Sequence, residues 1–596
     1  MDIKNILNKL IIILESPSVH FFALLVFLLT YIMWYVGYEV SGFDIPSVSK
    51  KIMIANALFI LSPFWLLKPQ HRKYAWIPII LISIWALMQL WYARNYNDIM
   101  PISSYFMFNN VTKLLIDSTI SSIRLSDLMI IIPNLICYLI YRFTILERLN
   151  RQKQNRSICS SIIIFLLSII LFFGQCYILI YGIDRTLNLK ETIETVKDFI
   201  TNNFGNSFYY KQIGLIPYLI ISSEYYFFSS DIELSTNEIQ QIRSFFDKQN
   251  TLSNLNKKDK NIIYIIIESW NSWTLDTKVS GREVTPIINK LTQQDNVIFS
   301  KKVVPQISSG RSSDGQFIYN TGLLPLKNEA VVTSYSDCEY PTLIKSQNLC
   351  TAVNIVCDSK LFWNQNNTSK YYGYDTIYDY NSIQNMNKEG IADKLMFDFA
   401  KKKLLELKQP FYAQLVTLTM HHPYNKLAVP PTWISKSNEF TFEIRNYLEA
   451  THFMDKQLGL FIDFLKKEGI YDNSIIIITS DHNDVSMTEN LSNTDVMIPF
   501  LILNADTTLH YDKIMGQIDI FPTILDIVGY NSSNWRGLGN SILRQPEVNS
   551  AVNKNENVIG DTSSILVNHQ RQAWNISEKL IKSRFFNKNN VNSLYD

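Results

Sequence analysis

Five apolar segments crowd the first third of this 596-residue chain and limit what it can fold into. Each approaches or reaches the roughly 17 to 25 residues that a membrane-spanning helix needs. The rest of the chain reads as a soluble domain rich in Asn, Ser and Lys. We therefore expect a multi-pass helical membrane domain with five spans, near His20–Val36, Ile52–Leu67, Ala75–Trp91, Leu128–Ile145 and Ser161–Ile183.

The basic residues that flank these segments predict their orientation, because cytoplasmic loops carry an excess of Lys and Arg. The N-terminus is therefore expected in the cytoplasm, and five crossings place everything after Asp184 on the outer side of the membrane. The basic residues are Lys4 and Lys9 before the first span, Lys68, Arg72 and Lys73 after the second, and Arg142, Arg148, Arg151, Lys153 and Arg156 between the fourth and fifth.

Charge and cysteine content argue against a nucleic-acid-binding protein and against a protein with a Cys-x-x-Cys zinc site. The 55 basic and 53 acidic residues nearly cancel, and no long basic run marks a nucleic-acid partner. Three of the six cysteines, Cys338, Cys350 and Cys357, lie in the polar part, so at most one disulfide forms among them and its pairing stays open. No Cys-x-x-Cys pair is present, which excludes the usual structural zinc spacing.

The stretch between the membrane part and the soluble domain is amphipathic, mixed in charge and rich in Tyr and Phe. Helices along the membrane interface have this composition, and so does an ordinary helical linker. The composition allows three domains: a transmembrane domain over 1–183, an interfacial helical linker over 184–256, and an extracytoplasmic domain over 257–596.

Short apolar runs alternate with helical stretches after Lys260, which predicts an α/β fold with helices on both faces of a sheet. Two of the runs are almost continuous β-branched residues, typical of central parallel strands. The expected strands are Ile262–Ile267, Ala352–Val356, Phe411–Val416, Ser474–Thr479 and Pro499–Leu503, and the expected helices are Thr285–Gln293, Ala392–Leu407 and Phe440–Lys467.

Both central strands are followed at once by residues that bind metals. Glu268 follows the first, and Asp481 and His482 follow the second. Ligands of open α/β sheets bind beyond the carboxyl ends of the strands. Two carboxylates and an imidazole suit Mn²⁺, Zn²⁺ or Mg²⁺. A Ser- and Gly-rich stretch, Gln306–Phe317, is expected to be a polar loop that brings a hydroxyl close to this cation, which would activate it as a nucleophile.

Taken in order, these motifs resemble the lipoteichoic acid synthase group of membrane phosphoglycerol transferases, within the alkaline phosphatase and sulfatase superfamily. The resemblance covers most of the chain. Besides the five spans it includes Lys211–Tyr218, Glu268-Ser269-Trp270, Gly281–Pro286, Gly310–Asp314, Phe362-Trp363-Asn364, Thr419–Tyr424, Ser480-Asp481-His482 and Gly516–Thr523.

The resemblance implies an extracytoplasmic domain of alkaline phosphatase/sulfatase type and assigns a role to each candidate site residue. One divalent metal ion is expected, Mn²⁺, with Zn²⁺ and Mg²⁺ as alternatives. The family's usual threonine nucleophile is a serine here, and Gln365 stands where the family has an arginine that contacts phosphate. Arg311, beside the nucleophile, either compensates for that arginine or is a solvated loop charge. The implied metal ligands are Glu268, Ser312, Asp481 and His482, the implied catalytic residues Ser312 and His421, and the implied substrate-binding residues Trp363, Gln365 and Arg311.

The activity implied is a two-step transfer in a bacterial cytoplasmic (inner) membrane. Ser312 would take a glycerophosphate headgroup from a phospholipid of the phosphatidylglycerol type and pass it to a glycan, lipid or polymer acceptor. A phosphoethanolamine transferase is the nearest alternative, although such enzymes tend to carry several disulfides. A non-catalytic membrane protein with a degenerate domain is the third reading, and Gln365 is the residue that favours it. A sulfatase is disfavoured because Ser312 is followed by Ser-Asp-Gly rather than by the Pro and Arg of a sulfatase motif.

Overall fold

The structure is a computed structural model in which the chain forms two compact units. One comprises residues 1–102 and 122–228, the other 103–121 and 229–596. The residues described are 17–41, 47–96, 98–111, 113–145, 162, 165–175, 210–211, 213–228, 232–247, 257–347, 349–383, 393–424, 429–484, 496–530, 535–563, 566–588 and 594.

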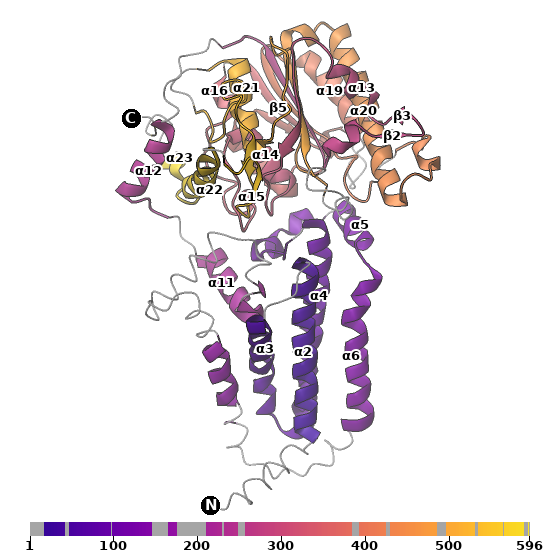
Figure 1. The fold of residues 1–596 in the computed structure, drawn as a ribbon, viewed down its shortest axis with the longest axis vertical. Coiled ribbons are helices and arrows are strands. Elements are labelled where there is room, and N and C mark those ends of the chain that lie inside the picture. The colour runs from indigo at the N-terminus through magenta and orange to yellow at the C-terminus, as the bar shows by residue number, and fades with distance from the viewer. Residues whose placement is uncertain are drawn as a thin grey trace, which may run out of the picture. The chain divides into compact units, whose positions relative to one another are not determined.

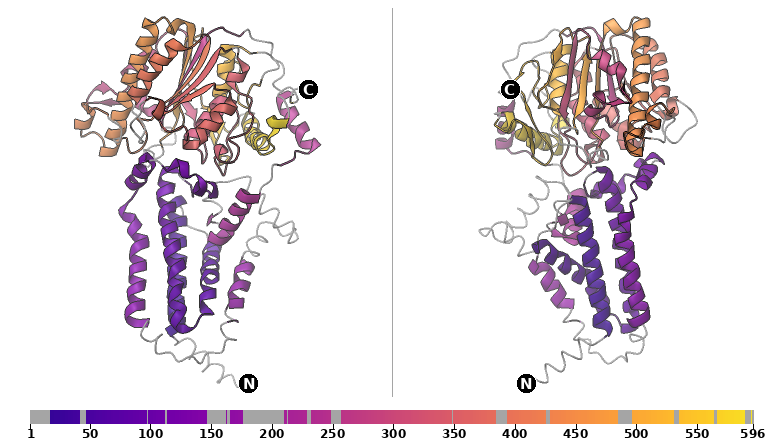
Figure 2. Two further views of the ribbon diagram at one scale, coloured as in Figure 1. Left: turned by 180° about the vertical axis from the view of Figure 1, so that it is seen from behind. Right: turned by 45° about the vertical axis from the view of Figure 1, so that its right-hand side comes forward.

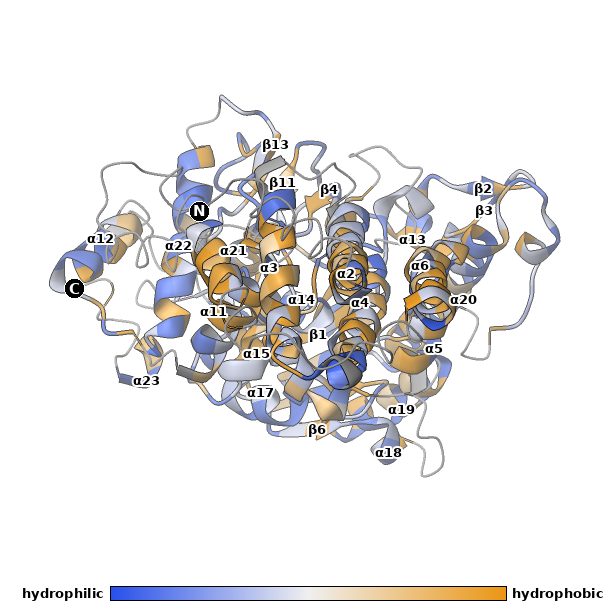
Figure 3. Ribbon diagram, turned by 90° about the horizontal axis from the view of Figure 1, so that it is seen from below, coloured by the Kyte–Doolittle hydropathy of each residue, from blue (hydrophilic) through white to orange (hydrophobic). Residues whose placement is uncertain are grey.

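The first unit is a group of apolar helices, most of them strongly hydrophobic along their length (Figures 1 and 3). Among the described residues, three helical stretches are long and apolar enough to cross a membrane: Pro17–Val40, His71–Tyr96 and Leu125–Ile145. The predicted second span corresponds to a 19-residue helix with Lys50 and Lys51 near its start. The predicted fifth span is described only in part, so the count of five stays a prediction. The labelled helices of this unit are α2 (Pro17–Ser41), α3 (Ser47–Trp65), α4 (Trp76–Tyr96), α6 (Leu128–Ile140) and α11 (Leu215–Phe228), and Phe165–Gln175 is a further short apolar helix.

The second unit includes a segment that lies, in the sequence, between two apolar helices of the first unit. Residues 103–121, encoded between α4 and α6, pack with the α/β domain and include helix α5 (Lys113–Ser121). Helix α12 (Thr236–Asp247) also joins this unit, because Ile242, Phe245 and Phe246 are buried in its core. The apolar face of α12 therefore packs on protein. A second amphipathic, mixed-charge segment of the linker, Lys190–Thr201, lies outside the described residues.

A nine-stranded mixed sheet forms the centre of the second unit (Figure 2). The middle strands run parallel, as predicted, whereas β9 runs antiparallel to both of its neighbours. Eight strands follow one another in the order β10 (Leu509–His510), β4 (Val297–Val304), β9 (Ile498–Leu503), β8 (Ser474–Ser480), β1 (Asn261–Ile267), β7 (Phe411–Val416), β5 (Thr351–Val356) and β6 (Thr376–Tyr378), and β11 (Met515–Gly516) pairs with β4.

The sheet is covered on both faces, so its central strands are apolar at nearly every position. Ile262, Tyr264 and Ile266 of β1 face one core, and the alternate residues of the same strand face the other. The helices with buried residues in the first core include α14 (Ser312–Thr321), α21 (Ile520–Val528) and α22 (Leu566–Lys582), and those of the second include α13 (Pro286–Leu291), α19 (Asp393–Glu406) and α20 (Phe442–Lys467). The five predicted strands and three predicted helices are all present, which confirms the α/β prediction.

The shorter elements complete the unit. They are β2 (Lys278–Val279), β3 (Arg282–Glu283), α15 (Val331–Ser334), α16 (Leu343–Ser346), α17 (Gln365–Tyr372), α18 (Tyr380–Ile383), β12 (Ser550–Val552), β13 (Val558–Gly560) and α23 (Phe585–Lys588). Cys338, Cys350 and Cys357 form no disulfide with one another, so the one disulfide that the sequence allowed among them is not made.

One prediction about local structure was wrong. The polar stretch expected to be a loop up to Phe317 becomes helical at Ser312, where α14 begins. The local sequence did not indicate a helix, because the polar side chains of this stretch form hydrogen bonds with distant parts of the protein. Gln316 Oε1, for example, accepts from Gln414 Nε2 at 3.3 Å.

Candidate metal centre and nucleophile

The register of two parallel strands creates the centre of the site. Ile267 at the end of β1 pairs with Ser480 at the end of β8, so the residues that follow them emerge side by side. The backbone N–H of Ser269 donates to Asp481 Oδ1 at 2.8 Å, and that of Glu268 donates to Thr417 Oγ1, beyond the end of β7, at 3.0 Å. Three neighbouring strand ends therefore fix this backbone.

Glu268, Asp481 and His482 bring one ligand atom each to within 4.8 Å of one another, and all three are buried. His482 Nδ1 lies 2.9 Å from the carbonyl oxygen of Asn483. If Nδ1 donates to this oxygen, Nε2 keeps its lone pair for a metal, which is the common arrangement of metal-binding histidines. Asp481 Oδ2 is buried and has no hydrogen-bond partner among the described residues, as expected for an oxygen that a cation would satisfy. These donors fit a divalent metal ion.

Charge within the cluster favours the same conclusion. Burial raises the pKa of Glu268 well above its usual range, and the nearby charge of Asp481 raises it further. Burial lowers the pKa of His482; Asp481 opposes this effect and Arg311 adds to it. Two buried carboxylates beside an imidazole whose pKa is lowered gather negative charge away from water, and a bound cation would balance it.

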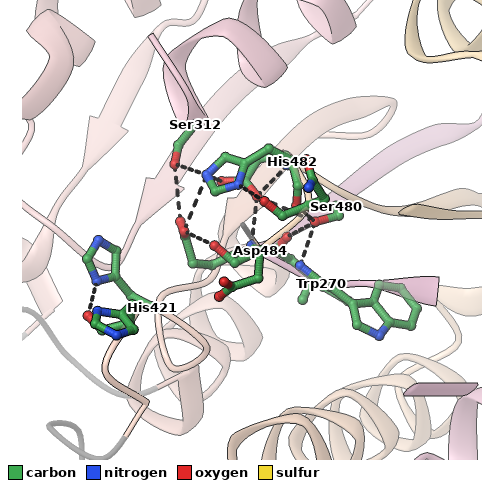
Figure 4. A network of polar contacts seen from close by, with 12 residues as sticks. Trp270, Ser312, His421, Ser480, His482 and Asp484 are labelled. Carbon is green, nitrogen blue, oxygen red and sulfur yellow. Dashed lines mark hydrogen bonds and ion pairs between the residues drawn. The ribbon is translucent and has the colours of Figure 1, made fainter. Parts of the chain in front are cut away.

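Ser312 lies at the first position of α14 and faces this cluster. Its hydroxyl oxygen is 3.3 Å from Glu268 Oε2 and 3.2 Å from His482 Nε2 (Figure 4). The N-terminus of a helix carries partial positive charge and free N–H groups, which favour an alkoxide or a phosphate oxygen. Helix α14 can come this close because residue 315 is glycine. A Cβ atom there would lie 2.3 Å from the carbonyl oxygen of Asp481.

The turn before Ser312 is held from within the protein. Asp314 Oδ2 accepts the backbone N–H groups of Ser308 at 2.8 Å and Gly310 at 2.9 Å. Arg311 adopts a φ of 45°, which is rare for a residue with a side chain. Its charge acts on His482, so Arg311 belongs to the electrostatic surroundings of the cluster.

His421 lies beside the cluster on the segment that follows β7 (Figure 4). Its Nδ1 is 2.8 Å from the carbonyl oxygen of His422, which favours the tautomer with Nε2 as a proton acceptor. Burial lowers the pKa of His421, so the ring is neutral near pH 7.

Trp363 and Gln365 lie on a different segment from the four clustered residues. Trp363 packs with Ala330 and Val332, after the end of α14, and is 6% exposed. Gln365 begins α17 and is equally buried. Its side-chain oxygen has no hydrogen-bond partner among the described residues.

Several residues that support the site were not predicted. Asp484 accepts a 2.5 Å hydrogen bond from the Tyr424 hydroxyl, and its backbone N–H donates to Asn271 at 2.8 Å. The Tyr447 hydroxyl donates to the Ser269 carbonyl oxygen at 2.7 Å. Only the acid three residues after Asp481 was a visible signal in the sequence. Gln517, part of the C-terminal motif, donates to the Asp481 carbonyl oxygen at 2.8 Å, so this motif supports the metal centre through its backbone.

Two family models match the chain, and together they cover both units. The sulfatase family matches residues 260–530, and the lipoteichoic acid synthase N-terminal domain matches residues 2–231. The chain is 26% identical over 561 residues to lipoteichoic acid synthase 2 of Bacillus subtilis (strain 168), covering 88% of this chain and 83% of that protein. It is 24% identical over 553 residues to lipoteichoic acid synthase of Staphylococcus aureus (strain USA300), covering 86% of this chain and 82% of that protein.

Among solved structures, the lipoteichoic acid synthase LtaP from Listeria monocytogenes matches 58% of this chain and 98% of its own, with 20% identity and a TM-score of 0.46. The two family models and the relatives agree with the structure, which has apolar helices in one unit and a covered mixed sheet in the other. The chain thus joins a lipoteichoic acid synthase N-terminal domain to a sulfatase-family domain, and it is similar over most of its length to lipoteichoic acid synthases.

Proposed function

We propose that this protein is a membrane-bound phosphoglycerol transferase that moves a glycerophosphate headgroup from a phospholipid to an acceptor hydroxyl through Ser312. The observation that carries the proposal is the position of the Ser312 hydroxyl, within 3.3 Å of both Glu268 and His482 at the start of a helix. The names of the relatives support the same reaction class, because those compared in sequence are lipoteichoic acid synthases.

The cation site consists of Glu268, Asp481 and His482, with the Ser312 oxygen completing it. A divalent ion held there would supply positive charge that favours the ionised Ser312 hydroxyl and the phosphate oxygens of the donor. Carboxylate and imidazole ligands suit Mn²⁺, which we propose as the native ion, and also Zn²⁺ or Mg²⁺.

In the first step, Ser312 Oγ attacks the phosphorus of a lipid of the phosphatidylglycerol type. The bond between phosphorus and the diacylglycerol oxygen breaks, and diacylglycerol leaves with the proton that the Ser312 hydroxyl gives up. The product on the protein is a glycerophosphoryl ester of Ser312. The N-terminus of α14 favours the charge on the phosphoryl oxygens during this step.

In the second step, the acceptor hydroxyl attacks the same phosphorus, the bond between phosphorus and Ser312 Oγ breaks, and the acceptor's proton restores the Ser312 hydroxyl. Neutral His421, with Nε2 as an acceptor, is suited to take the proton from that hydroxyl. The acceptor is a glycan, lipid or polymer.

Trp363, Gln365 and Arg311 are the proposed headgroup-binding residues. An amide cannot provide the paired charged donors of the family arginine. The Gln365 side-chain oxygen does offer an acceptor in a buried place, which suits a headgroup hydroxyl. Arg311, beside Ser312 and close enough to affect His482, is placed to provide positive charge for the phosphate.

The proposed cellular arrangement follows the sequence. A five-span transmembrane domain (1–183) lies in the bacterial cytoplasmic membrane with its N-terminus inside. A linker (184–256) leads to the catalytic domain (257–596) outside. A lipid donor agrees with this arrangement, because the membrane holds both the enzyme and its substrate.

A direct test measures diacylglycerol release by the full-length protein in nanodiscs of phosphatidylglycerol with Mn²⁺. We expect release by the wild type and by Ser312→Thr, which keeps the hydroxyl, and loss of at least about 1,000-fold in Ser312→Ala. Ser313→Ala is the matched control, because the Ser313 hydroxyl donates to the Gly310 carbonyl oxygen. Full activity of Ser312→Ala would refute the proposal. Release of diacylglycerol from phosphatidylethanolamine instead would point to the phosphoethanolamine transferase alternative. If neither lipid released diacylglycerol, the protein would be non-catalytic.

A further inference from the structure

The segment 103–121 contacts two loops of the proposed active site, although the chain places it between two apolar helices. We propose that this segment is a positioning part of the active site: through His422 it orients His421, and through Asn110 it fixes the turn that carries Trp363. The inference rests on the proposed function, which assigns roles to His421 and Trp363.

Helix α5 contacts the ring of His422. Ser118 Oγ lies 3.2 Å and Ser121 Oγ 3.3 Å from His422 Nδ1, and the histidine side chain is 14% exposed. On its other side, His422 Nε2 lies 3.5 Å from Glu443 Oε1. The ring is therefore held between α5 and the first turn of α20.

The held residue is also the one that orients His421. The carbonyl oxygen of His422 lies 2.8 Å from His421 Nδ1, and this contact favours Nε2 as the proton acceptor. A shift of His422 would move that carbonyl and so the imidazole of His421. Misplacing a proton acceptor by about 1 Å is enough to lower a rate by about 100-fold.

The preceding turn of the same segment holds Trp363. The backbone N–H of Trp363 donates to Asn110 Oδ1 at 2.9 Å, and the Thr333 hydroxyl lies 3.3 Å from Met107 Sδ. Trp363 and Asn364 have φ values of 51° and 50°, a conformation that side chains disfavour. Strain of this kind persists when surrounding contacts impose it, and Asn110 is one of these contacts.

The chain ties this segment closely to two apolar helices. Helix α4 ends at Tyr96 and α6 begins at Leu128, so only residues 97–102 and 122–127 separate these helices from the segment 103–121. The two helix ends are joined by Arg94, whose guanidinium contacts the Asp127 carboxylate at 2.6 and 3.1 Å. A bidentate ion pair that is largely buried is a geometrically specific link. Through the chain, the residues that orient His421 and Trp363 are thus connected to a fixed pair of apolar helices.

The test uses the full-length protein in phosphatidylglycerol nanodiscs and the double variant Ser118→Ala/Ser121→Ala. We expect kcat for diacylglycerol release with a hydroxyl acceptor to fall at least about 10-fold, with KM and metal content within about twofold of the wild type. The double variant Ser118→Thr/Ser121→Thr keeps both hydroxyls and should recover most of kcat. Thr119→Ala is the control on the same helix, because that hydroxyl donates to the Leu115 carbonyl oxygen.

A second readout does not depend on turnover. Modification of histidines by diethyl pyrocarbonate, followed by peptide mass spectrometry, should be several-fold faster at His422 in the double alanine variant than in the wild type or Thr119→Ala. The inference would be overturned by any one of three results. These are an unchanged kcat in the double alanine variant, a double threonine variant as slow as the alanine variant, and an unchanged modification rate at His422. An inactive wild type would refute the proposed function instead, and the modification rate would still decide whether α5 holds His422.

Discussion

Ile267 of β1 and Ser480 of β8 are paired in register on neighbouring parallel strands. Because the next residues are Glu268 and Asp481, this one backbone pairing sets two carboxylates side by side at the carboxyl ends of two central strands. Asp481 Oδ2 then remains buried without a hydrogen-bond partner among the described residues. Predictions about the metal follow from this arrangement.

Replacing Asp481 by Asn should abolish metal binding. Asn keeps an oxygen for the backbone N–H groups of Ser269 and His482 but turns the unsatisfied Oδ2 into an amide group that repels a cation. We expect the metal content, measured by mass spectrometry, to fall to a small fraction of the wild-type value. Exposed Asp463→Asn is the control.

Removal of the metal by a chelator should lower Tm. An ion present at about 100 times its Kd contributes about 2.7 kcal/mol to the free energy of unfolding. We expect Tm of the wild type to fall by a few degrees on chelation and to recover with Mn²⁺. A Tm of Asp481→Asn that still responds to the ion would contradict the assignment of the ligands.

Gly315→Ala should separate Ser312 from the cluster. The added Cβ would lie 2.3 Å from the carbonyl oxygen of Asp481, so α14 or the end of β8 must shift. We expect a loss of about 100-fold or more in diacylglycerol release and a lower Tm. Gly459→Ala in α20 is a milder control, because the atoms nearest to the new Cβ belong to the flexible side chain of Ile287, the first at 3.0 Å. Wild-type activity of Gly315→Ala would show that the close approach is unnecessary.

The rate should depend on pH through His421. We propose its neutral form as the proton acceptor, and burial lowers its pKa below the ordinary value of 6.5. The rate should therefore persist below pH 6.5 and fall when His421 becomes protonated at lower pH. His421→Gln should reduce kcat by about 100- to 10,000-fold and remove this acid limb. If the rate of His421→Gln still fell at low pH, the titrating group would be a residue other than His421.

Cys350 offers a natural probe of the predicted orientation. Its thiol is free and exposed, whereas Cys137, Cys338 and Cys357 are buried. With the catalytic domain outside, a membrane-impermeant maleimide should label intact cells at Cys350, and Cys350→Ser should lose this labelling. Labelling at Cys350 only after lysis would contradict an external domain.

The parts of the fold that depend on local pattern were predictable. The residues of β1 and β8 are buried at every position because both faces of the sheet are covered, and their long apolar runs are visible in the sequence. The clustering of Glu268, Asp481 and His482 was predictable for the same reason, since these residues directly follow the two strands. Strand β4 and the antiparallel direction of β9 were not predicted, because strand direction depends on long-range pairing.

The start of α14 and the role of residues 103–121 were not predictable from pattern. Ser312 lies in a run of Ser, Gly and Asp that favours a loop locally, but in the structure Asp314 binds the preceding turn and Gly315 lies against the end of β8. The contacts of Ser118 with His422 join residues 304 positions apart. Nothing in the neighbourhood of either residue in the sequence indicates such a contact.

The central claim is a covalent transfer through Ser312, and mass spectrometry of the protein after brief incubation with phosphatidylglycerol tests it most directly. With Mn²⁺ present and no acceptor, we predict a glycerophosphate adduct on the Ser312 peptide, also formed by Ser313→Ala and missing in Ser312→Ala and Asp481→Asn. Diacylglycerol release by the wild type with no adduct on Ser312, or an adduct on another residue, would contradict the account.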